Sequence, residues 1–145
     1  MPDIQGAYLP TMDAAREGMV ANSVDFDIIS RNCETANVGF GRAMVQGAAA
    51  EGVALGAAGF FLGVTVRNPA LRVDNNDQYQ IGDGVALLSR GAMWVVSVAA
   101  CVAGNPVYRT ATGTLTPTAA GNTLVDRAYF ETAAAAGGLA RIALH

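Results

Sequence analysis

Apolar and polar residues alternate with a period of two along most of the chain beyond residue 25. In residues 60–67, a mixed face alternates with an apolar face made of Phe60, Leu62, Val64 and Val66. This period is typical of a β-strand, because successive side chains point to opposite faces of a sheet. The pattern predicts strands at 26–31, 36–46, 60–67, 85–90, 93–102, 106–110, 113–116, 124–130 and 139–144.

One predicted strand is apolar on both of its faces. Residues 93–102 carry Trp94 and four valines or alanines on one side, and Met93 and Cys101 among the residues on the other. Such a strand is expected to be buried on both sides. The uncharged stretch around it, Gly91 to Gly104, is shorter than the about 20 residues that a membrane-spanning helix needs. We therefore expect no membrane partner.

Turn-forming residues separate the predicted strands. Examples are Gly82-Asp83-Gly84, Gly104-Asn105-Pro106 and Gly121-Asn122. Glycine, asparagine, aspartate and proline favour turns through their backbone preferences and short side chains. Many short strands with a turn about every ten residues predict an all-β fold, a small antiparallel β-sandwich or barrel of the jelly-roll or tulip-like kind.

Two segments of the chain resemble each other. Residues 52–66 and 84–98 are identical at seven of fifteen positions, including the glycines Gly59 and Gly91. We interpret them as two similar hairpins, each with a short strand, a glycine turn and a longer buried strand. Chance similarity in a chain rich in glycine, alanine and valine is the alternative.

The first 25 residues differ from the rest of the chain. Pro2 and Pro10 interrupt them, and a short helical turn is hinted at only by scattered apolar residues near Met12 and Met19. Residues 1–35 hold six acids and two arginines, a net charge of −4, whereas the rest holds seven arginines and six acids, a net of +1. We predict an extended N-terminal arm at 1–25 and one β domain at 26–145.

The chain offers few groups for catalysis or metal binding. Its single histidine, His145, is the last residue of the sequence, and no internal histidine can activate a serine. Cys33 and Cys101 are too few and too far apart for a metal site. We expect two reduced, buried thiols, with a Cys33–Cys101 disulfide as the alternative. No catalytic residue, cofactor or metal is expected.

The charge of the chain argues against nucleic acid as a partner. The net charge is −3 and there is no lysine, whereas a duplex-binding module needs a basic face to neutralise phosphates. About half of the residues are apolar. A small acidic chain with an arm that lacks its own core suggests a component built to associate with other proteins. Trp94 fits a core position, and the alternative for it is an interface anchor.

A series of short motifs resembles the capsid cement, or decoration, proteins of tailed bacteriophages. The motifs run in order along nearly the whole chain, and they are residues 18–21 (GMVA), 29–31 (ISR), 38–47 (VGFGRAMVQG), 61–67 (FLGVTVR), 79–88 (YQIGDGVALL) with Gly91 and 94–95 (WV), 103–108 (AGNPVY) and 113–116 (GTLT). Each motif alone is a weak pattern of glycines and β-branched residues, so the resemblance depends on their order.

The resemblance implies a non-catalytic β-rich protein that binds the outer surface of a phage head. Its partners would be the major capsid protein and further copies of itself, as a dimer or trimer, and it would be made in the host cytoplasm and carried on the virion. We place the candidate capsid contacts in the arm and at two strand-flanking arginines: Tyr8, Leu9, Met12, Met19, Val20, Arg67 and Arg72.

Three other functions remain open at this point. One is a different structural role in a virion, such as a minor head or baseplate component. Another is a small trimeric β-barrel enzyme acting on nucleotides, for which Asp83, Ser89 and Arg90 are the available site residues. The third is a carbohydrate-binding domain displayed on a particle, because a β fold does not determine function.

Overall fold

The computed structural model describes residues 17–20, 26–56, 59–67 and 78–145. Within these ranges the chain forms strands and connecting turns and no helix, which confirms the predicted all-β class. The strands are β1 (Asp27–Cys33), β2 (Ala43–Gln46), β3 (Gly52–Ala54), β4 (Phe61–Thr65), β5 (Gly84–Val96), β6 (Pro106–Arg109), β7 (Leu115–Thr116), β8 (Thr123–Phe130) and β9 (Leu139–Leu144).

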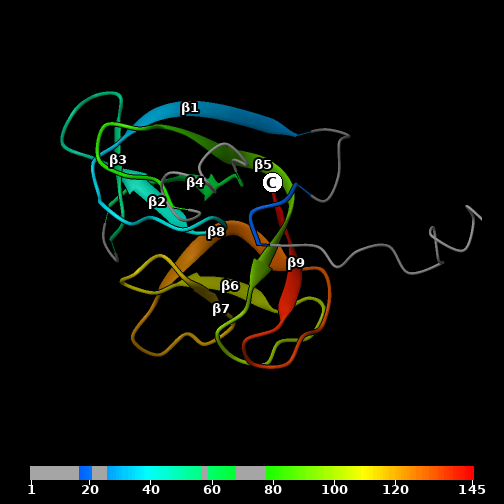
Figure 1. Cartoon of the computed structure of the whole chain (residues 1–145). Helices are drawn as coiled ribbons and strands as arrows, with labels where there is room; N and C mark the ends of the chain where they lie inside the picture. Colours follow the sequence, from blue (N-terminus) through cyan, green and yellow to red (C-terminus); the bar gives the residue numbers. More distant parts are fainter. Residues whose placement is uncertain (1–16, 21–25, 57–58, 68–77) are drawn as a thin grey trace, which may run out of the picture.

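The strands form two rolled sheets that share β5 (Figure 1). The first is a closed five-stranded barrel in the order β1-β3-β2-β4-β5, with β5 pairing back to β1. The second runs β5-β9-β8-β6-β7, and a parallel bridge between Ser97 and Leu115 returns β7 to the end of β5. All named strand pairs are antiparallel except β1 with β3. Closure pairs most strand edges within the molecule.

The long strand β5 connects the two sheets through Gly91. Residues 84–90 pair with β1 and β4, whereas residues 91–96 pair with β9. Gly91 has a φ of +125°, and a Cβ there would lie 2.7 Å from the Cβ of Phe26. Glycine is required because it alone tolerates both this backbone conformation and the close approach.

The predicted pair of similar hairpins is therefore wrong. In the second segment, Gly91 lies inside one continuous strand, and not in a turn between separate strands at 85–90 and 93–102. In the first segment, β3 and β4 are not paired with each other, because both pair with β2. Gly91 marks a bend within β5, whereas Gly59 lies in the connection between β3 and β4. The residue pattern does not distinguish these two roles.

Side chains of β5 alternate between two hydrophobic cores. Leu87 points into the barrel with Phe40, Met44 and Tyr79, while Leu88 points into a second core between the barrel and the other sheet. The expectation that 93–102 is buried on both faces is wrong. Met93, Val95 and Ser97 are buried, but β5 ends at Val96, and Val98 and Val102 are exposed.

The two cysteines lie in different cores and are free thiols. Cys33 lies in the barrel core, where its Sγ donates to the carbonyl of Thr35 at 3.0 Å. Burial raises the pKa of this thiol above its ordinary value of 9.0. The reduced, buried state expected for both residues is confirmed, and the disulfide alternative is not observed.

Candidate functional site

Residues 17–20, which lie within the predicted arm at 1–25, run along one edge of β5. The amide of Gly18 donates to the carbonyl of Trp94 at 2.8 Å, and the amide of Trp94 donates to the carbonyl of Met19 at 2.9 Å. Val20 forms an antiparallel bridge with Met93 and packs against the second core. Because Trp94 bonds this segment through its backbone, the segment occupies the β5 edge that faces away from β9.

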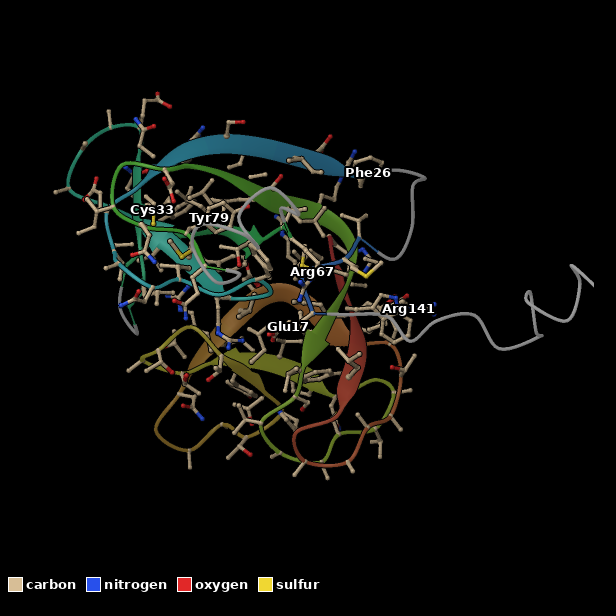
Figure 2. All side chains as sticks on the ribbon, viewed as in Figure 1. Glu17, Phe26, Cys33, Arg67, Tyr79 and Arg141 are labelled. Carbon is tan, nitrogen blue, oxygen red and sulfur yellow. The ribbon has the colours of Figure 1, made fainter. Side chains whose placement is uncertain are left out.

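Glu17 holds the start of this segment against the barrel. Its carboxylate lies 3.3 Å from Nη1 of Arg42, and its carbonyl accepts a 3.0 Å hydrogen bond from Nε of Arg67. The amide of Arg67 also donates to the carbonyl of Gly18, and its guanidinium lies 4.8 Å from the centre of the Phe40 ring. Figure 2 shows Glu17 and Arg67 close together where the two sheets meet. We call residues 17–20 with Arg42 and Arg67 the arm clamp.

The arm clamp is tightly packed at Gly18. Its φ is +81°, and a Cβ on it would lie 2.6 Å from the Cβ of Phe40. Gly41, with a φ of +72°, lies on the other side, where its own Cβ would be 3.2 Å from the amide nitrogen of Gly18. No side chain fits at either glycine without moving the neighbouring residues.

An apolar and aromatic surface borders the arm clamp. Met19 and Phe26 are about 40% exposed, and Trp94 is half-buried beside them on β5. The guanidinium of Arg141, which is opposite Trp94 in the β5–β9 register, lies 5.9 Å from the Trp94 ring and 2.9 Å from a carboxylate oxygen of Glu131. Figure 2 shows Phe26 and Arg141 on the same side of the molecule. We call Met19, Phe26, Trp94 and Arg141 the root face.

Three of the candidate contact residues lie in this region. Met19 is on the root face, Val20 points mainly inward, and half-buried Arg67 belongs to the arm clamp. The other candidates, Tyr8, Leu9, Met12 and Arg72, fall outside the described residues. Sequence reasoning missed the Glu17–Arg42 pair, because 25 positions separate the two residues and no local pattern connects them.

The residues considered for an enzyme are not brought together. The carboxylate of Asp83 accepts a hydrogen bond from the Gln80 amide within a turn, whereas Arg90 lies 3.2 Å from the carboxylate of Asp27 at the other end of the barrel portion of β5. Seven residues of extended chain put Asp83 and Arg90 on the order of 20 Å apart. The Oγ of Ser89 donates to the carbonyl of Asp27.

Metal-binding clusters and membrane-spanning helices are both absent from the described ranges. No group of three or more histidine, cysteine, aspartate or glutamate side chains in the described part of the chain has the arrangement of a metal site. In the same part of the chain, no helix has the length and hydropathy to cross a membrane.

Two solved structures that are similar to this chain come from phage heads. A chain from the capsid of the Myoviridae phage XM1 superposes with a TM-score of 0.74 over 94% of both chains at 16% identity. The N base of the head fiber protein gp8.5 of bacteriophage phi29 gives a TM-score of 0.54 over 83% of this chain and 95% of the other, at 15% identity. These likenesses establish a shared fold.

Sequence comparison gives the family. No curated protein matches this chain by sequence. The family model for the structural cement protein, described by E217 gp24 and Pam3 gp6, matches residues 4–145, which include the arm clamp, the root face and both sheets. The chain therefore belongs to the structural cement protein family of bacteriophages, a family of capsid-associated virion proteins.

Proposed function

We propose that this protein binds the outer surface of a phage head and bridges neighbouring major capsid subunits, and that it catalyses no reaction. The observation that carries the proposal is the root face next to the arm clamp. Exposed Met19 and Phe26 and the half-buried ring of Trp94 border the place where the preceding residues join the folded body. Aromatic, methionine and arginine side chains are enriched in protein interfaces, which matches this composition.

Bridging is the role that suits a small protein present in many copies. One copy offers a modest contact area, but a copy that touches two subunits makes the second contact at a high effective concentration. Many such copies together resist the separation of subunits under the pressure of packaged DNA. The net negative charge of the first 35 residues favours a position outside the shell, because packaged DNA repels acidic segments.

The proposal includes the state and the location of the protein. We infer a homo-oligomer, a dimer or trimer, made in the host cytoplasm and then bound to the assembled head. The partners are the major capsid protein and other copies of this chain, without nucleic acid and without membrane. Charged residues make up only 14% of the chain, which supports recognition by shape and apolar contact.

The test is binding to purified heads that lack the protein. The full-length chain is titrated onto the heads, bound copies are counted by quantitative gel densitometry, and head disruption is followed during heating. We expect saturation at hundreds of copies and an increase in the disruption temperature. Saturation near a dozen copies would instead indicate a connector or baseplate component, and no binding to the outer surface would overturn the proposal.

The role of the arm is tested with a deletion that leaves the arm clamp intact. Removal of residues 1–25 would also remove Val20 from the second core and the backbone bonds to Trp94. A chain that begins at Glu17 keeps these contacts and removes the sixteen preceding residues, so it is the appropriate variant. We expect it to bind heads more weakly than the full chain, and unchanged occupancy would remove the arm from the proposed interface.

A further inference from the structure

A groove lies where the two sheets diverge, away from the arm clamp. It has a volume of about 660 Å³ and is bounded by Gly59–Leu62 at the start of β4 and by Thr123, Leu124, Asp126 and Arg127 of β8. Ser89, Leu144 and His145 complete its lining together with Arg109. Its volume falls in the range of about 300–1,000 Å³ that is common for ligand-binding clefts.

Strand pairing stops on both sides of this groove. In the described residues, β9 pairs with β8 at Ala128–Phe130, and a last hydrogen bond joins the His145 amide to the Arg127 carbonyl. On the other side, β4 pairs with β5 at Val64 and Thr65, beyond the residues that line the groove. The groove is therefore bordered by strand segments at which an extended peptide can add main-chain hydrogen bonds.

The side chains of the groove combine apolar and cationic groups. Phe60 and Leu124 are 74% and 50% exposed and form the apolar rim. Arg109 is 3% exposed, and its Nη2 donates to the Gly59 carbonyl at 2.9 Å while its guanidinium lies 5.8 Å from the Phe61 ring. Asp126 supplies a carboxylate on the exposed side of the groove.

Arg127 has an uncommon backbone conformation at the groove. Its φ is +59°, and it lies in a bulge where the β6–β8 register shifts between Pro106 and Tyr108. A non-glycine residue in this conformation costs of order 1 kcal/mol or more and is concentrated at binding sites, and bulges redirect the side chains that they carry. The bulge keeps the Asp126 and Arg127 side chains exposed at the groove.

We propose that this groove binds the first sixteen residues of a second copy of the chain. These residues combine large apolar side chains with Asp3, Asp13 and Arg16, which suits a groove with an apolar rim and the exposed charges of Arg127 and Asp126. Pro2 and Pro10 disfavour a helix and leave an extended segment as the docking form. Sixteen extended residues reach about 50 Å, enough to cross between adjacent molecules.

The position of the clamp supports a link between copies. The arm joins the body on the β5 edge away from β9, whereas the groove lies beyond the end of β9, next to β8. Arm and groove are two different surfaces, so two copies can exchange arms reciprocally in a closed dimer, or each copy can pass its arm to the next in a ring. This link goes beyond the proposed attachment to the capsid, because it joins one cement molecule to the next.

The experiment uses two full-length variants that are each defective in one half of the contact. Leu124→Asp places a charge on the groove rim, and the double substitution Tyr8→Ser with Leu9→Ser changes the arm. We expect sedimentation velocity to show concentration-dependent association of the unchanged chain, weakened at least tenfold in each variant. A mixture of the two variants should form a one-to-one complex that does not grow further, because one variant keeps its arm and the other keeps its groove.

A matched control and a separate binding assay make the result decisive. Val102→Asp places the same charge at a position that is 58% exposed and is not part of the groove lining, so it should leave association unchanged. Equal unfolding midpoints exclude misfolding. A monomeric unchanged chain, or association that is insensitive to Leu124→Asp, would overturn the link. Binding of the variants to heads at low occupancy tests attachment independently, so failure of the link leaves the proposed function testable.

Discussion

The carboxylate of Glu17 lies 3.3 Å from the guanidinium of Arg42, and both side chains are about three-quarters buried. Arg42 immediately precedes β2, and Glu17 belongs to the segment that runs beside β5, so the pair joins the arm to the barrel. Arg67 adds a second connection through the Glu17 carbonyl. Residues 17–20 of the predicted arm are thus part of the folded body.

Loss of this ion pair should affect binding to heads more than stability. We expect Arg42→Gln to lower the free energy of unfolding by about 1 kcal/mol or less, because partly exposed ion pairs contribute little. The number of copies bound to heads should fall clearly even though stability changes little, because the arm is then held less firmly against the barrel. Urea denaturation and head titration measure the two quantities. Arg31→Gln, which removes a pair with the exposed Glu51, is the control and should leave occupancy unchanged.

Gly18 provides a sharper test of the arm clamp. Gly18→Ala combines an unfavourable φ with a Cβ that would be 2.6 Å from Phe40, so we expect a loss of about 2–4 kcal/mol in the free energy of unfolding. Gly104→Ala has a similar φ of +92° but meets no atom within 4 Å, and should cost about 1–2 kcal/mol. Equal losses in the two variants, measured by chemical denaturation, would show that packing at Gly18 is unimportant.

The strands were largely predictable because their signals are local. Alternation of apolar and polar residues located β1, β4, β6, β8 and β9 to within a few residues, since one face of each strand is buried. The short strand β3 and the continuity of β5 through Gly91 were not located. Three residues are too few for a period, and the positive φ of Gly91 depends on the approach of Phe26 from another strand.

The site was predictable only in part, because contacts between residues far apart in the sequence form it. The composition of the arm indicates Met19, whereas the sequence leaves Trp94 open as either a core or an interface residue. In the structure Trp94 is half-buried, and Arg141 lies opposite it on β9 with its guanidinium 5.9 Å from the ring. The groove between β4 and β8 combines residues more than 50 positions apart, so no sequence pattern indicates it.

Trp94 is expected to be the most important side chain of the root face for binding to heads. Buried aromatic anchors often contribute 2 kcal/mol or more to an interface, so Trp94→Ala should weaken binding by at least thirtyfold. Val98→Ala changes a 49% exposed apolar residue near the end of β5 and serves as the control, with a change of less than threefold. Competition binding on heads measures both. Similar losses for the two variants would place the interface elsewhere.

High pH should destabilise the fold through two buried groups. Burial raises the pKa of the Cys33 thiol above 9.0 and the pKa of the Tyr79 hydroxyl above 10.0, and Tyr79 donates to the Val66 carbonyl at 2.6 Å. Above pH 9 the unfolded chain releases these protons while the folded chain retains them. The unfolded state then binds fewer protons, so the free energy of unfolding falls as pH rises.

The dependence on pH can be assigned with two substitutions. We expect the free energy of unfolding, followed by urea denaturation, to decline between pH 9 and pH 11. Cys33→Ala should remove the part of the decline that begins near pH 9, and Tyr79→Phe the part that begins near pH 10, although each variant is less stable at neutral pH because both side chains are buried. The free energy of unfolding of both variants could instead depend on pH in the same way as that of the unchanged chain. This result would mean that neither group retains its proton in the folded state.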